Sequence, residues 1–179
     1  MNTKYEFVPG DEITIAPGRT VKRIRALIAI SYFASPGALG GYIESENSLS
    51  MSGDAWVYGN AWVSGDAWVS GDAQVYGNAR VSGNAQVSGD ARVYGNALVY
   101  GKGLIVWFSG VGTENGTLTI YNTKDNELEV TRGCFRGNVD AFLAASEAKH
   151  DDATHLEYRL LIEVAHSRIT RARETVPAP

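Results

Sequence analysis

The side chains best suited to chemistry lie in the last third of the chain. Cys134 is the only cysteine, and Arg132 and Arg136 on either side of it could lower the pKa of its thiol. A lone cysteine with histidines unplaced around it is more often a half-buried structural residue in a strand or turn. We therefore expect no catalytic residue. The histidines, expected on exposed helix faces, are His150, His155 and His166.

Acidic residues and histidines do not have the spacing of a metal site. His150-Asp151-Asp152 and His155 match no strong ligand template. A column of aspartates in the central repeats, Asp54, Asp72 and Asp90, could hold a cation. Asparagine takes the equivalent place in the neighbouring columns, however, so the position requires mainly a turn former. The sequence predicts neither a metal nor a cofactor.

Aromatic residues are the stronger candidates for a binding surface. Tyrosines recur every 18 residues, and stacked coils about 4.8 Å apart would align them as a continuous ladder. Three tryptophans follow the alanine of the first three hexapeptides and should lie on three faces of one coil. Large indoles are seldom left bare, so a terminal segment or a neighbouring subunit is expected to cover them, with ligand binding as the alternative.

The candidate binding residues also include two arginines of the repeats. These arginines should lie on different faces of the rod, where they contribute solubility more than a phosphate clamp. The full set is Trp56, Trp62, Trp68, Tyr58, Tyr76, Tyr94, Arg80 and Arg92.

These residues belong to eight consecutive hexapeptides that extend from Gly53 to Tyr100. A short fixed period indicates a solenoid, and the columns that recur every third hexapeptide indicate 18-residue coils with three flat sides. β-Branched valine suits the inward strand position, alanine suits a tight corner, and glycine with Asp or Asn suits the turn. The hexapeptides are GDAWVY, GNAWVS, GDAWVS, GDAQVY, GNARVS, GNAQVS, GDARVY and GNALVY.

The pattern resembles the left-handed parallel β-helix of the hexapeptide-repeat proteins. Val-Tyr-Gly-Asn-Ala-Arg at 75–80 matches that family's order of aliphatic, variable, two turn, small and variable residues. The resemblance predicts that the repeats form a short left-handed parallel β-helix. With an N-terminal β cap and a C-terminal α+β cap, which the end segments predict, the chain is expected to be mainly β. The best known members are acyltransferases with a histidine general base. Here no histidine precedes His150 and no loop interrupts 53–100, so none of their catalytic residues carries over.

A second resemblance covers more of the chain. The segment LGGYIESENSLS before the first hexapeptide, together with Trp107-Phe108-Ser109, the stretch TLTIY and Arg132-Gly133-Cys134-Phe135, resembles uncharacterised phage and prophage hexapeptide-repeat proteins. This resemblance implies a viral origin and no particular activity.

The two ends differ from the repeats. Residues 1–38 predict a β cap with strands at 5–8, 13–15 and 21–30, separated at Pro9-Gly10 and Pro17-Gly18. Residues 39–103 predict the β-helix, beginning with an irregular coil. Residues 104–179 predict three strands (104–108, 117–121 and 127–131), a helix capped by Asn138, and a helix at about 153–171 followed by a loose tail, RARETVPAP. This last helix should pack through Leu156, Leu160, Val164 and Ile169.

Composition limits the remaining possibilities. The net charge is −4 and no segment is strongly basic, so nucleic-acid binding is not expected. One cysteine favours a reducing compartment, and no apolar run has membrane-spanning length. We expect a soluble cytoplasmic protein that binds a host protein or a small ligand without catalysis and forms a trimer through the tyrosine face. The alternatives are an acyl-CoA-dependent acyltransferase and a structural assembly factor.

Overall fold

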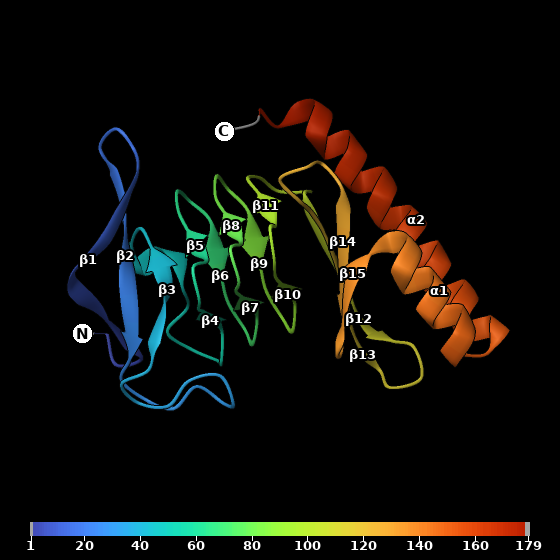
Figure 1. Cartoon of the computed structure of the whole chain (residues 1–179), viewed down its shortest axis with the longest axis horizontal. Coiled ribbons are helices and arrows are strands. Elements are labelled where there is room, and N and C mark those ends of the chain that lie inside the picture. The colour runs from blue at the N-terminus through green and yellow to red at the C-terminus, as the bar shows by residue number, and fades with distance from the viewer. Residues whose placement is uncertain (1, 178–179) are drawn as a thin grey trace.

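The computed structural model describes residues 2–177 and confirms a mainly β fold around a left-handed parallel β-helix with 18-residue coils. Each hexapeptide contributes one two-residue strand, and each of the first five strands pairs in parallel with the strand three hexapeptides later. The three sides are β4–β7–β10, β5–β8–β11 and β6–β9, in the middle of Figure 1. The strands are β4 (Trp56–Val57), β5 (Trp62–Val63), β6 (Trp68–Val69), β7 (Gln74–Val75), β8 (Arg80–Val81), β9 (Gln86–Val87), β10 (Arg92–Val93) and β11 (Leu98–Val99).

Valine and alanine fill the inside of the rod, as predicted. Every valine and alanine of the eight hexapeptides is buried. At Gly71 the turns of successive coils stack so closely that a side chain would not fit. Gly71 has a φ of +67°, and a Cβ atom there would lie 2.9 Å from the backbone nitrogen of Gly89. The turn and the inward positions therefore each accept few residue types, which is why the pattern is strict.

The N-terminal cap continues one side of the rod. Strands β1 (Tyr5–Ala16) and β2 (Arg19–Ala26) form an antiparallel hairpin, and β3 (Leu39–Ile43) joins β2 to β5. Two expectations were wrong. Pro9-Gly10 lies inside β1, because Gly10 at φ +77° forms a bulge instead of a turn. The strand predicted for 21–30 ends at Ala26, where the chain turns away to form the segment 27–38 beneath the coils (Figure 1).

A buried lysine closes the N-terminal end of the rod. Lys4 is 1% exposed, and its Nζ donates hydrogen bonds of 3.0 Å and 2.9 Å to the carbonyl oxygens of Ser50 and Gly53. Ser50 belongs to the irregular first coil, which contains the short 3₁₀ helix η1 (Glu46–Ser48) and pairs Leu49 with Val69, and Gly53 begins the first hexapeptide. Nothing in the local sequence around Lys4 distinguishes it from a solvated lysine, so this role could not be predicted from the sequence.

The C-terminal cap adds two layers across the other end of the rod (Figure 1). An antiparallel sheet of β12 (Ile105–Val111), β13 (Gly116–Asn122), β14 (Leu128–Arg132) and β15 (Phe135–Asn138) comes first. Helices α1 (Val139–Lys149) and α2 (Asp152–Thr175) pack behind it. Strand β15 was not predicted, because Gly133 before it and Gly137 within it are more typical of a loop. Asn138 caps α1 as predicted, accepting a 2.8 Å hydrogen bond from the Ala141 nitrogen.

Polar side chains of this sheet satisfy the backbone groups of the last coil. The Thr131 hydroxyl donates to the Arg92 carbonyl oxygen at 2.8 Å, and the Thr119 hydroxyl accepts from the Arg92 nitrogen at 3.2 Å. The Asn122 amide donates to the Leu98 carbonyl oxygen at 3.0 Å. An open coil end would otherwise present unpaired donors and acceptors that invite end-to-end stacking. The hydroxyl and amide groups of the sheet thus supply the hydrogen bonds that a further coil would otherwise make.

Helix α2 packs through a different face from the one predicted. Its buried residues are Tyr158, Ile162, Ala165, Ile169 and Ala172. Of the four residues predicted to pack, Ile169 is buried, whereas Leu156, Leu160 and Val164 are exposed. The sequence offers two apolar stripes, and the sheet covers only one.

The C-terminal tail was expected to be loose, but α2 continues through its first part to Thr175. Residues 178–179 lie outside the described residues. No helix within the described residues combines the length and the apolar character needed to cross a membrane.

Candidate functional site

The tyrosines stack along one side of the rod. The ring centroids of Tyr58 and Tyr76 lie 4.7 Å apart with nearly parallel planes, and those of Tyr76 and Tyr94 lie 4.8 Å apart at 43°. The 18-residue period places them one above another, so their separation equals the ordinary distance between paired strands. The ladder that the spacing predicts is present.

Residues from both caps cover the ends of this ladder. Phe33, from the segment 27–38, stacks on Tyr58 with centroids 6.5 Å apart. Arg136 of β15 places its guanidinium carbon 4.8 Å from the Tyr76 ring centroid and 4.7 Å from that of Tyr94. Only 6% of Tyr76 is exposed. The ladder is therefore less open than the predicted trimer would require, and the oligomeric state stays a prediction.

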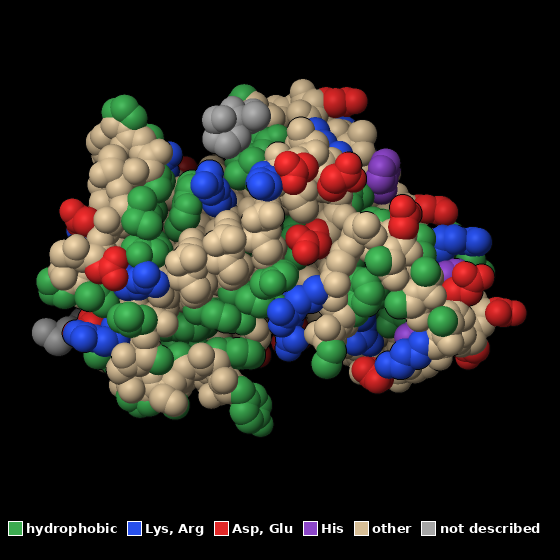
Figure 2. Space-filling model, in the orientation of Figure 1, with side chains coloured by type: hydrophobic (Ala, Val, Ile, Leu, Met, Phe, Trp, Pro, Cys, Tyr) green, Lys and Arg blue, Asp and Glu red, His purple; other side chains and the backbone are tan. Residues whose placement is uncertain are grey.

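Two arginines define the polar edge of this surface, where Lys and Arg side chains gather between the coils and the C-terminal sheet (Figure 2). Arg136 is exposed, and Arg92 donates a 3.2 Å hydrogen bond to the Gly133 carbonyl oxygen. Burial raises the pKa of Tyr58 to about 12, although the charges of Arg136 and Arg92 oppose that rise. We call this surface the tyrosine–arginine face; its members are Tyr58, Tyr76, Tyr94, Arg92 and Arg136.

A carboxylate beside this face should make stability depend on pH. Burial raises the pKa of Glu129 above its ordinary value, against a hydrogen bond with the Tyr121 side chain that lowers it. Because the folded state holds this proton more tightly, stability is fully present below the unfolded pKa and is lost as pH rises through the folded pKa. We expect Glu129→Gln to have a higher Tm than the wild type at pH 7.

The wild type and Glu129→Gln should have similar Tm values at pH 4, where Glu129 is mostly protonated in both the folded and the unfolded protein. Thermal melts of both chains at the two pH values would measure this difference. The prediction would be contradicted if the Tm of Glu129→Gln, relative to that of the wild type, were lower at pH 7 than at pH 4.

The three tryptophans lie on three different faces, as predicted, and do not form one site. Trp56 is fully buried against Tyr5, and its Nε1 has no hydrogen-bond partner among the described residues. Trp62 lies under Arg80, whose guanidinium carbon is 5.4 Å from the ring. Trp68 is 46% exposed. The N-terminal hairpin thus covers the first indole, an arginine of the next coil covers the second, and the third remains accessible.

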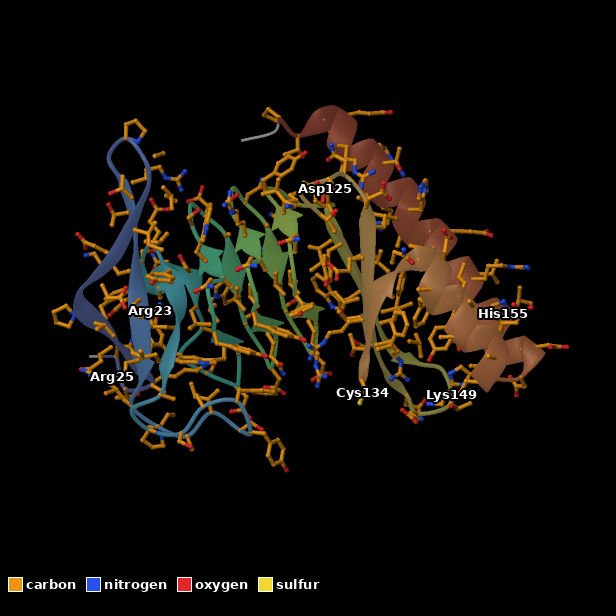
Figure 3. The ribbon with its side chains drawn as sticks, viewed as in Figure 1. Arg23, Arg25, Asp125, Cys134, Lys149 and His155 are labelled. Atoms are coloured by element: carbon orange, nitrogen blue, oxygen red, sulfur yellow. The ribbon has the colours of Figure 1, made fainter. Side chains whose placement is uncertain are left out.

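Cys134 lies in the turn between β14 and β15 and is exposed, not half-buried (Figure 3). It lines one edge of a cavity of about 270 Å³ whose other walls include Phe142, Lys149 and His150. His155 does not contact the thiol; its Nδ1 lies 3.3 Å from the Ser146 hydroxyl. His166 is exposed on α2. The structure therefore places only His150 on the same cavity as the thiol.

This arrangement does not assemble a nucleophile, a base and an orienting group. Ser146 is 3% exposed, so its hydroxyl is poorly placed to attack a substrate. Within the described part of the chain, no three His, Cys, Asp or Glu side chains come close enough together to hold a metal ion.

Comparison with known proteins identifies the repeats alone. The family model described as YdcK beta solenoid repeat matches residues 52–71, 73–89, 85–101 and 91–104. The chain is therefore a repeat β-helix protein, and its coils are similar to those of that family. No curated protein matches the chain. Both caps, which supply Phe33 and Arg136, lie outside the matched residues.

Proposed function

We propose that the protein is a non-enzymatic binding protein that uses the tyrosine–arginine face to hold an anionic group of its partner. The observation that carries this proposal is the position of Arg136, which is exposed while its guanidinium lies over the rings of both Tyr76 and Tyr94. A guanidinium stacked on an aromatic face keeps its edge free for a carboxylate or phosphate. The stacking also limits the side-chain entropy that binding would remove.

The construction of the face supports a binding role for the rod. The coils supply three tyrosines and Arg92, the N-terminal segment supplies Phe33, and the C-terminal sheet supplies Arg136. A rigid array of coils holds these contributions from distant parts of the chain at fixed separations. Binding sites gain affinity when their groups are positioned in advance, and this face is so positioned.

The resemblance of this chain to phage hexapeptide-repeat proteins suggests its origin and the compartment in which it acts. We propose a phage-encoded accessory or counter-defence protein that acts in the host cytoplasm on a host protein or a small ligand. The acyltransferase alternative rests on the resemblance of the coils to hexapeptide-repeat enzymes. A separate catalytic alternative uses Cys134 and His150, which share a cavity. We give both second place because a fold alone does not carry an activity and no acid–base pair is assembled at that cavity.

The experiment compares partner retention by matched variants. Wild-type protein and Arg136→Gln would be used to capture partners from phage-host lysate, with mass spectrometry of both proteins and small molecules. We expect Arg136→Gln to lose at least about tenfold of the retained partner, since interface anchors carry most of the binding energy. Arg25→Gln, a like change in the hairpin where Arg25 pairs with Glu6, should retain it.

Two further variants separate binding from catalysis. Cys134→Ser and His150→Ala should each retain the partner and the biological effect within a few-fold. Equal retention by Arg136→Gln and the wild type would exclude the tyrosine–arginine face. A folded Cys134→Ser or His150→Ala protein that loses the effect, together with acyl-CoA turnover by the wild type, would restore the enzyme.

A further inference from the structure

The outer face of α2 carries an apolar stripe that this chain does not cover. Leu156, Leu160 and Val164 are 42%, 50% and 49% exposed, and their spacing of four residues places them on one side of the helix. The opposite side already packs on the C-terminal sheet through Ile162 and Ile169. A helix that packs on one side alone needs a single apolar stripe. Helix α2 has two, so the packing within this chain accounts for one of them and not for the other.

The position of α2 makes this stripe available for pairing. The helix forms part of the outermost layer at the C-terminal end of the molecule (Figure 1). Its 24 residues give a length of about 36 Å. Leu160, Val164 and Arg168 line a shallow open pocket on this outer side. A long, straight, partly apolar helix surface fits a second helix of similar length.

The distribution of charges along α2 favours a second copy of α2 as the partner helix. The half from 151 to 163 has four acidic residues and one arginine, whereas the half from 164 to 175 has three arginines and one acidic residue. An antiparallel copy of α2 would place each acidic half beside a basic half, and a parallel copy would place like charges together. Among the described residues, Arg159, Glu163, Arg168 and Arg171 form no ion pair.

We propose that α2 pairs antiparallel with α2 of a second copy of this chain, about a two-fold axis that crosses the outer face of α2 between Leu160 and Val164. With Leu160 opposite the partner's Val164, the same alignment brings Arg159 beside the partner's Glu163. By symmetry each contact occurs twice. One alignment therefore matches both the apolar stripe and the flanking charges.

This dimer leaves both tyrosine–arginine faces accessible. They lie where the coils meet the inner side of the C-terminal sheet, whereas α2 lies behind that sheet. Two rods would extend in opposite directions from a central helical layer. The pairing rests on α2 alone and does not depend on the proposed function.

The mass of the full chain in solution tests the pairing. Sedimentation equilibrium at micromolar concentration should give two chains for the wild type and one for Leu160→Glu. Ile28→Glu is the matched control, because Ile28 is also a half-exposed aliphatic residue, 49% exposed, in the distant N-terminal segment. Arg159→Glu should weaken association at least about tenfold, and Arg159→Glu with Glu163→Arg should restore it.

Crosslinking tests the orientation. In a Cys134→Ser background, Glu163→Cys lies near the two-fold axis and should form a disulfide-linked dimer on mild oxidation. Ala153→Cys lies far from its symmetry mate in an antiparallel pair and should not. Circular dichroism would establish that each variant is folded. A wild type of one or three chains, a dimer that survives Leu160→Glu, or equal crosslinking through Ala153→Cys would overturn the proposal.

Discussion

Inserting one alanine between Tyr76 and Gly77 is expected to abolish folding. Every later valine would move from the inside of the rod to the outside, because strand side chains alternate between the two faces. Four fully buried valines follow the insertion: Val81, Val87, Val93 and Val99. Each would lose about 1.5–3 kcal/mol of burial energy. Their sum is comparable with the whole stability of an ordinary domain, about 5–15 kcal/mol.

Deleting the complete coil from Gly71 to Ser88 is the matched control. The deletion joins Ser70 to Gly89 and keeps the register, so that Val93 takes the place of Val75. It also replaces Asp72, whose carboxylate accepts a hydrogen bond from the Asp54 nitrogen at 3.0 Å, with Asp90 of the same column. Both end caps keep their hydrogen bonds to the coil ends, because Lys4 bonds upstream of the deletion and Asn122 bonds downstream.

Circular dichroism and thermal melting would compare the two variants. The coil deletion should remain soluble and unfold cooperatively, although at a lower temperature than the wild type, because it loses one coil-to-coil interface. The insertion should show no cooperative transition. A folded insertion variant together with an unfolded deletion variant would contradict the proposed register.

The rod could be predicted from the sequence because its contacts repeat at a fixed spacing along the chain. Each glycine, alanine and valine meets the same residue type 18 positions later, so period and composition determine both the coil and its core. The tyrosine ladder follows from the same arithmetic. What covers the ladder does not, because Phe33 and Arg136 are 103 residues apart in the sequence and neither belongs to a repeat.

The caps were predicted less well because their contacts are not periodic. Lys4 and Asn122 are ordinary surface residues by type, and only the open coil ends give them buried partners. Helix α2 illustrates a different limit. Its two apolar stripes are both consistent with an amphipathic helix, and the choice between them depends on the shape of the sheet that it covers. Of the stripe predicted to pack, Leu156, Leu160 and Val164 are exposed, and Ile169 alone is buried.

Asn122 is the residue of the C-terminal cap for which we expect the largest effect. It is fully buried. Its amide donates to the carbonyl oxygens of Leu98 and Thr123 at 3.0 Å each, and its Oδ1 accepts a 2.8 Å hydrogen bond from Arg173. This one side chain therefore connects the last coil, the sheet and α2.

Replacing Asn122 with leucine should destabilise the protein by about 3 kcal/mol or more, since each buried group left without a partner costs about 1–3 kcal/mol. Leucine has a similar volume, so the loss would come from hydrogen bonding and not from a cavity. Asn78→Leu is the control, because Asn78 is exposed in a turn of the coils and its replacement should change stability by about 1 kcal/mol or less. Urea unfolding would measure both variants. A loss below about 1 kcal/mol for Asn122→Leu would mean that packing alone holds the cap on the rod.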